Sequence, residues 1–205
     1  MYDGKCTVYF RDKTTKELDV GCDSYNSQYG IPLSEDGSKL FVGSWAKDFG
    51  GNKKGLHAYD INSGALLWRV NEGKIRHIFV YTNYLIALKA YACIFKIDID
   101  SGAILGQIKS GTIENIFNLG FPYVLADTMS GKLSVIDVEK MLIVRKYSTK
   151  TVNPFECLSC VIREAVLNDN KLTIYGFEEY PNKNYDISGS NEFCRIIDTD
   201  FPSKY

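Results

Sequence analysis

Few side chains in this sequence could do acid–base or metal chemistry. Its 205 residues include two histidines, His57 and His77. His57 stands beside Leu56 and Ala58 in an alternating apolar segment, and His77 begins another such segment, so we interpret both as packed, structural histidines. Two histidines argue against metal centres built from several imidazoles and leave few general bases. The sequence therefore favours a protein that is not an enzyme.

Cysteines provide one further candidate site. Cys157 and Cys160 have the spacing of a zinc or redox half-site. A zinc site needs four ligands, and the sequence has no second close cysteine pair. A redox pair normally begins a helix, whereas this one leads into a predicted strand. The signatures of phosphate-binding loops, dinucleotide sites and serine hydrolases are also missing from the sequence. We therefore predict no catalytic residue, no metal and no cofactor.

Aspartates recur at a fixed repeat position and do not form a carboxylate cluster. Asp60, Asp98 and Asp137 each end an alternating apolar segment and precede a turn. The intervals between them are 38 and 39 residues, which is the length of a four-stranded propeller blade. Weaker copies of the segment end at Asp12 and Asp198. Their repeat position predicts that these aspartates form turns.

The sequence around each aspartate is typical of four short strands, A to D, joined by turn residues, and no segment has the apolar stripe and caps of a helix. Series of this kind occupy residues 20–70, 76–109, 113–147 and 157–205, the last without a clear D strand, and residues 5–20 form a C–D hairpin. We predict one all-β domain over residues 1–205. It is a single β-propeller of about five four-stranded antiparallel blades, with four blades plus a hairpin as the alternative.

One block also resembles a known family. Six of its residues resemble the Gly-x-x-x-Ala-x-Asp-x-x-(Thr/Ser)-Gly-x-x-x-Trp pattern of pyrroloquinoline-quinone-type repeat β-propellers, which belong to the quinoprotein-like and WD-repeat-like propellers: Gly55, Ala58, Asp60, Ser63, Gly64 and Trp68, with Gly55 one position closer to Ala58 than in the pattern. Residues 93–108 resemble the pattern less closely. The resemblance implies a tight glycine turn, an aspartate that ties this turn to backbone donors, and a tryptophan packed between neighbouring blades. Gly106 and Arg145 replace the tryptophan in the next two blocks, so we expect a small, degenerate ring.

Loop lengths favour one face of such a disc. The A–B and C–D turns are uniformly short, whereas the B–C and D–A connections hold the long insertions, at residues 21–27, 46–54, 148–156 and 178–191. Loops held on a rigid scaffold commonly carry binding sites. We assign partner binding to aromatic and charged residues of these loops: Tyr25, Phe49, Lys53, Lys54, Glu178, Glu179, Tyr180 and Tyr185.

The net charge and the lack of signal or membrane segments limit the class of partner and the location that we expect. Lysine and arginine total 24 and aspartate and glutamate 25, a net charge of −1 that argues against nucleic acid. With no signal or membrane segment and six scattered cysteines, we expect a cytoplasmic protein without membrane contact, monomeric on its own. We predict a non-catalytic protein-binding module, in one version an immunity protein that neutralises a bacterial toxin, such as a basic nuclease, by occlusion. The alternatives are a degenerate enzyme or small-ligand propeller using the central channel, and a scaffold subunit of a larger complex.

Overall fold

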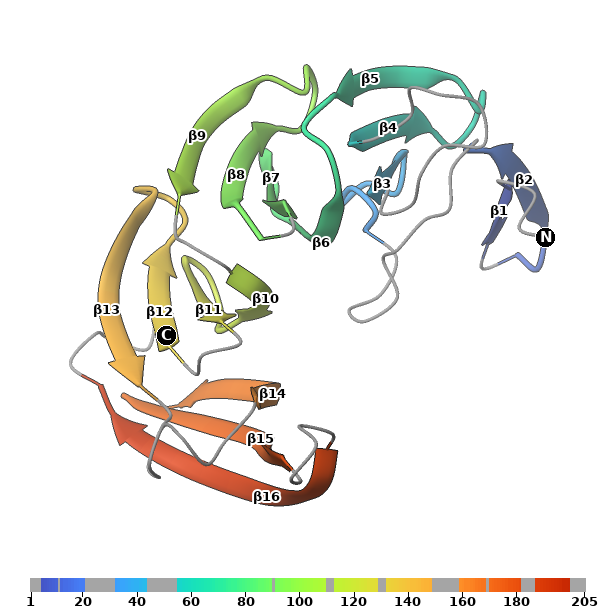
Figure 1. Cartoon of the computed structure of the whole chain (residues 1–205). Helices are drawn as coiled ribbons and strands as arrows, with labels where there is room; N and C mark the ends of the chain where they lie inside the picture. Colours follow the sequence, from blue (N-terminus) through green and yellow to red (C-terminus); the bar gives the residue numbers. More distant parts are fainter. Residues whose placement is uncertain are drawn as a thin grey trace. The chain divides into compact units, whose positions relative to one another are not determined.

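The computed structural model describes residues 5–10, 12–20, 32–43, 55–89, 91–109, 113–128, 132–148, 159–168, 170–181 and 187–199. Within these ranges all regular secondary structure is β-strand, and the strands form five antiparallel sheets (Figure 1). The chain divides into two compact units, Met1–Ser110 and Gly111–Tyr205. The predicted all-β class is therefore confirmed, and the single domain over residues 1–205 stays a prediction.

The first unit holds three of the five sheets. A two-stranded hairpin is followed by a three-stranded and a four-stranded sheet, and consecutive strands are neighbours in each. The strands are β1 (Lys5–Tyr9) and β2 (Thr15–Asp19); β3 (Lys39–Gly43), β4 (Leu56–Asp60) and β5 (Leu66–Val70); β6 (Ile75–Val80), β7 (Tyr84–Lys89), β8 (Cys93–Asp98) and β9 (Ile104–Lys109). The hairpin predicted over residues 5–20 and the four strands predicted over 76–109 are confirmed.

The strand series predicted over residues 20–70 is shorter in the described part of the chain. In place of a first strand, Leu33 makes a single bridge to Leu40. Pro32 accepts a hydrogen bond from the backbone N–H of Phe41 at 3.0 Å but has no N–H to donate in return. A turn at residues 35–38 follows almost at once. The pairing is therefore confined to a few residues.

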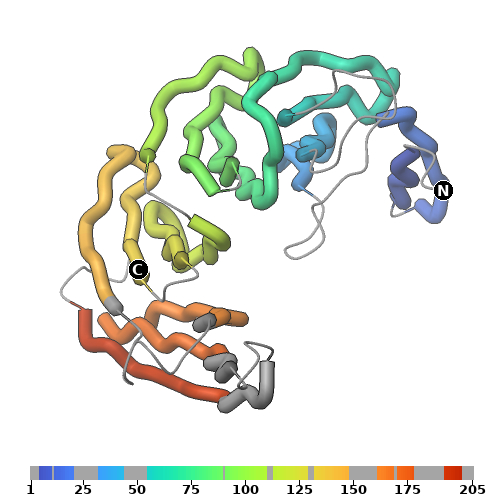
Figure 2. Tube along the Cα trace, in the orientation of Figure 1, coloured from blue at the N-terminus to red at the C-terminus, as the bar shows by residue number. Residues whose placement is uncertain are grey.

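The second unit holds two sheets. The four-stranded sheet comprises β10 (Ile113–Asn118), β11 (Tyr123–Thr128), β12 (Lys132–Asp137) and β13 (Leu142–Ser148). The other sheet comprises β14 (Ser159–Asn168), β15 (Lys171–Pro181) and β16 (Ile187–Asp198). Figure 2 follows the Cα trace through them. The series over residues 113–147 is confirmed, and the last series has three strands among the described residues.

The repeated aspartates make turns, as their position predicts. Asp60 accepts hydrogen bonds from the backbone N–H and hydroxyl of Ser63 at 2.6 and 2.7 Å, and Asp98 accepts the same pair from Ser101 at 2.7 and 2.6 Å. These hydrogen bonds lower the pKa of both carboxyl groups. In the third copy, Met141 replaces the turn glycine and adopts a φ of 52°.

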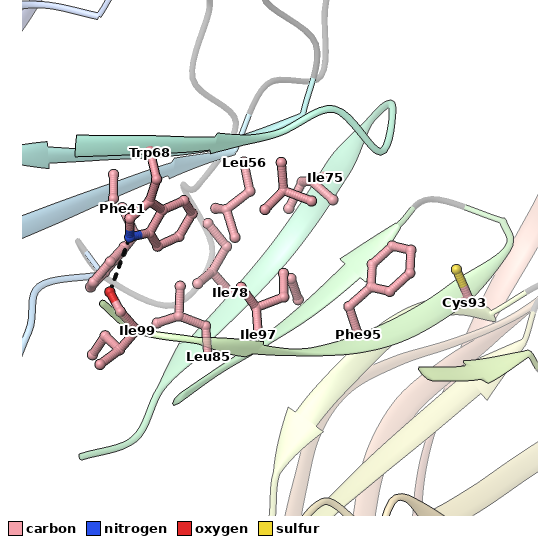
Figure 3. Close-up of a cluster of buried hydrophobic side chains, with 13 residues drawn as sticks. Phe41, Leu56, Trp68, Ile75, Ile78, Leu85, Cys93, Phe95, Ile97 and Ile99 are labelled. Carbon is pink, nitrogen blue, oxygen red and sulfur yellow. Dashed lines mark hydrogen bonds between the residues drawn. The ribbon is translucent and has the colours of Figure 1, made fainter. Parts of the chain in front are cut away.

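Trp68 joins two sheets of the first unit. It lies on β5, and its indole N–H donates a hydrogen bond to the carbonyl of Ile99, just after β8, at 3.1 Å (Figure 3). The Phe41 ring lies 5.9 Å from the Trp68 ring, centroid to centroid. A Cβ on Gly102 would lie 2.7 Å from the indole, so the missing side chain makes room for the ring. The packing of this tryptophan between neighbouring blades is confirmed.

The outermost strands of three sheets share a β-bulge. Opposite β4, β8 and β12, one residue of the outer strand has no partner in register: Leu67, Leu105 and Val144. Bulges increase local twist and protect sheet edges from pairing with other chains. The outer edges of these three sheets are therefore protected by the same device.

The turn before β3 gives a pH prediction. Asp36 accepts hydrogen bonds from the hydroxyls of Ser34 and Ser38 and from the backbone N–H of Ser38, and these lower its pKa from 3.8 to about 2. A carboxyl group with a lowered folded-state pKa stabilises the fold above its unfolded pKa, and this contribution is lost as the pH falls towards the folded value. We expect Asp36→Asn to make the thermal midpoint less dependent on pH between about 4 and about 2. Glu35→Gln in the same turn is the control, and equal pH dependence in both variants contradicts the prediction.

Candidate protein-binding face

The residues predicted to bind a partner fall into two groups. Five of them lie outside the described residues: Tyr25, Phe49, Lys53, Lys54 and Tyr185. The other three, Glu178, Glu179 and Tyr180, belong to strand β15. Of the predicted insertions, residues 21–27 and 46–54 lie wholly outside the described part, and so does 148–156 apart from Ser148, the last residue of β13.

The long loop predicted over residues 178–191 is wrong for most of its length. Strand β15 continues to Pro181, and β16 begins at Ile187. Glu178 pairs in register with Asn191, and Tyr180 pairs with Gly189. Backbone pairing needs no apolar side chains, so a polar hairpin of this kind has no alternating pattern by which it could be recognised. The connection itself, residues 182–186, lies outside the described residues.

This hairpin makes the last sheet longer than the others. Strands β14, β15 and β16 have 10, 11 and 12 residues, whereas β1 to β13 have five to seven. At about 3.3 Å per residue, β15 spans roughly 36 Å, against roughly 20 Å for a six-residue strand. Pairing shows where the extra length lies. Lys89 pairs with the residue five before Asp98, and Gly176 pairs with the residue five before Asp198.

Strand β7 ends at Lys89, but β15 continues five residues beyond Gly176. The added residues of β15 and their partners on β16 therefore extend the B–C end of the sheet. This is the end where the sequence places the long B–C connections. We call the segment 177–181 and 187–192 the arm.

Aromatic and charged side chains lie at the base of the arm. The guanidinium group of Arg163 lies 4.8 Å from the centre of the Phe177 ring, and that of Arg195 lies 4.7 Å from the Phe193 ring. Cation–π contacts at these distances fix the orientation of both rings. Tyr175 is exposed, and its electrostatic interaction and hydrogen bond with Cys194 raise its pKa. The base of the arm thus carries one exposed and two partly buried aromatic side chains.

The candidates for chemistry lie elsewhere. Both histidines are buried, His57 on β4 and His77 on β6. The His57 ring lies edge-on to the Tyr59 ring, with 6.3 Å between the ring centroids. The burial of both histidines supports the structural interpretation. Cys157 lies outside the described residues, and Cys160 lies on β14. Among the described side chains, no three histidine, cysteine, aspartate or glutamate residues gather as metal ligands would.

The described part of the chain contains no helix of the length and apolarity needed to cross a membrane.

Comparison with known proteins identifies the architecture. No family model matches the chain, and no curated protein matches it in sequence. Among solved structures it is similar to BamB from Moraxella catarrhalis, with a TM-score of 0.58 and 14% identity over 88% of this chain and 57% of that one. It is also similar to the dihydro-heme d1 dehydrogenase NirN in complex with DHE, with a TM-score of 0.61 and 13% identity over 95% of this chain and 44% of that one.

A third similar structure is the computationally designed protein Ika8, with a TM-score of 0.56 and 15% identity over 86% of this chain and 53% of that one. The chain therefore spans about half the length of these proteins. BamB and NirN are β-propellers of the pyrroloquinoline-quinone-like type. At these identities the likeness establishes the fold alone, and the chain has the β-propeller fold.

Proposed function

We propose that this β-propeller is a non-catalytic module that binds another protein through its long-connection face, with the arm at the centre of the contact. The observation that carries the proposal is the length of β15 and β16, which extend this one sheet at its B–C end. A paired hairpin loses less conformational freedom on binding than a free loop of the same length. The arm is therefore a suitable element to present side chains to a partner.

The residues of the arm indicate the chemistry of that partner. Tyr180 lies on β15, and Tyr185 lies in the connection that follows it. Tyrosines are rigid, amphipathic anchors that are enriched at interface hot spots. Glu178 and Glu179 add two negative charges next to them, which favours a basic partner surface. In the sharper version of the proposal, the partner is a basic nuclease toxin that the propeller neutralises by covering its active site.

The tyrosines provide the test. We expect Tyr180→Ala and Tyr185→Ala each to weaken binding by roughly 2 kcal/mol, about 30-fold in Kd, because each removes an anchor from the interface. The partner is captured from the native cell, identified by mass spectrometry, purified, and titrated against each variant by calorimetry. Tyr9→Ala removes a tyrosine that is 78% exposed on β1 and does not belong to the arm, and it is the matched control.

The outcomes separate the versions of the proposal. Loss of affinity in the two arm variants, with unchanged affinity in the Tyr9 variant, supports the binding face. Equal affinity in all three variants removes the arm from the interface. A captured protein with nuclease activity that the propeller inhibits supports the toxin version, and a partner without such activity excludes it.

A further inference from the structure

Strand β16 lies at the edge of its sheet, whereas its counterparts in three other sheets each have a further strand on their outer side. In the described structure β4, β8 and β12 each end in the repeated aspartate, and each pairs on its outer side with β5, β9 or β13. Strand β16 corresponds to them, because it also ends in the repeated aspartate, Asp198. It pairs with β15 on one side, and no strand of the described residues pairs with it on the other (Figure 1).

Strand β16 exposes apolar side chains at positions where its counterparts in the other sheets bury them. Four positions before the aspartate, the other three strands have a fully buried aliphatic residue: Leu56, Ile94 and Leu133. In β16 this residue is Cys194, which is exposed. Two positions before Asp198, the side chain of Ile196 is 65% exposed. In the other sheets the following sheet covers these positions, since Leu56 and Ala58 share a buried cluster with Ile75. In β16 this apolar face is open, so a partner that pairs with the edge would also bury it.

From Gly189 to Asp198 the edge of β16 lacks the bulge found on the other outer strands, and its one register shift lies at Ser188, near the start of the strand. Strands β5, β9 and β13 each carry a bulge. The pairing of β16 with β15 is continuous from Gly189 to Asp198, and β16 contains no proline. A long, regular edge strand is a template for pairing with an added strand.

We infer that the outer edge of β16 binds an extended segment of the partner protein, which adds to the sheet as its fourth strand. This inference rests on the proposed function and specifies how the partner is held. In their own sheets, β5, β9 and β13 occupy the place that the added strand would take beside β16, so their residues indicate the composition of the segment. Strands β5, β9 and β13 combine apolar residues with Arg69, Lys109, Arg145 and Lys146, and contain no acidic residue.

Strand β16 has the complementary charge. It carries Glu192 and Asp198 against Arg195. Opposite charges in neighbouring strands are favourable, and like charges are unfavourable. The occupant is therefore a segment of the partner that combines apolar and basic residues.

A peptide probe tests this inference on the full chain. The probe is a fluorescein-labelled peptide with the sequence of residues 140–148, Lys-Met-Leu-Ile-Val-Arg-Lys-Tyr-Ser, which includes β13. We expect saturable binding by fluorescence anisotropy. We expect at least a tenfold loss of affinity when alternate peptide nitrogens are methylated, because methylation removes the N–H donors of a strand pair. Absence of binding, or equal binding of the methylated peptide, overturns the inference.

Substitutions locate the bound peptide. Ile196→Lys places a positive charge beside the added strand, and we expect it to weaken binding at least tenfold. Leu142→Lys changes an exposed aliphatic residue on β13 in the same way and is the matched control, with an expected change of less than about twofold. Equal effects of the two variants overturn the assignment to β16.

Two measurements on the free protein exclude other occupants. Amide hydrogen exchange is expected to show rapid exchange at the outward N–H groups of residues 192–198 and protection after the peptide is added. Protection already present in the free monomer means that the chain itself fills the edge and overturns the inference. Sedimentation that reveals a dimer broken by Ile196→Lys identifies a second copy as the occupant and also overturns it.

The two proposals fail in different ways. If the tyrosine variants lose affinity for the captured partner but the peptide does not bind, the proposal that the arm binds the partner stands and strand addition at β16 is excluded. If the peptide binds at β16 but the tyrosine variants keep full affinity for the partner, Tyr180 and Tyr185 are excluded as interface residues and strand addition at β16 stands.

Discussion

Replacing Trp68 with alanine is expected to lower the free energy of unfolding by about 3–5 kcal/mol, the usual loss for a large aromatic side chain removed from a core. The ring is 9% exposed and packs with Phe41 and the buried residues of the next sheet. The substitution also leaves the carbonyl of Ile99 without the indole donor that lies 3.1 Å from it. Urea denaturation followed by circular dichroism measures the change.

Two further variants separate the contributions to the loss of stability in Trp68→Ala. Leu67, the adjacent bulge residue, is 45% exposed, so Leu67→Ala is expected to cost less than about 1 kcal/mol. Trp68→Phe keeps an aromatic ring but loses the hydrogen bond, and an intermediate cost is expected. If Trp68→Ala and Leu67→Ala have the same cost, Trp68 does not join the two sheets.

The sequence predicts the aspartate turns well because local chemistry decides them, whereas the position of Trp68 between two sheets was expected from the resemblance to a repeat family. An Asp-x-x-Ser turn is closed by hydrogen bonds within four residues, and the alternating strands on either side bury one set of side chains. Met141 illustrates the limit of such a pattern. It adopts the left-handed conformation that glycine has in the other copies, because the flanking strands determine the turn.

The arm could not be predicted in the same way. Residues 178–181 and 187–191 include glutamates, serine, glycine and proline, which are typical of a loop. They pair because the strands before and after them are already in register, from Leu172 opposite Ile197 to Phe177 opposite Glu192. Such an extension follows from nonlocal pairing and has no local signal. The charge and tyrosines of the arm were visible in the sequence, but their support by a hairpin was not.

The free edge of β16 follows from comparing strands within one chain. The apolar pattern ending in Asp198 resembles the patterns ending in Asp98 and Asp137, but a pattern does not show which strands have a neighbour. The strand pairing adds that information. Exposure of Ile196 at a position whose equivalents in β4 and β12 are buried shows that the adjoining face is open as well. The arm proposed to bind the partner and the edge strand therefore belong to the same sheet, which has the longest strands in the described structure.

Gly55→Ala is expected to destabilise the fold by about 3 kcal/mol or more, because no side chain fits at this position. Gly55 precedes β4 and has a φ of 127°, and a Cβ there would lie 1.9 Å from the carbonyl oxygen of Val70. Val70 is paired with Leu56 at the end of β5, so the clash is with backbone and cannot be relieved by a rotamer change. Relief requires β5 to move away from β4, which weakens the pairing on which the position of Trp68 depends.

Gly37→Ala provides the matched control for this backbone clash. Gly37 also has a positive φ, 69°, but no atom lies within 4 Å of the position a Cβ would take. Its substitution is therefore expected to cost about 1 kcal/mol, from conformational strain alone. The difference between the two variants in urea denaturation isolates the contact with Val70. Equal costs contradict the close approach of β4 and β5, and a larger cost at Gly55 supports it, since both variants carry the same added methyl group.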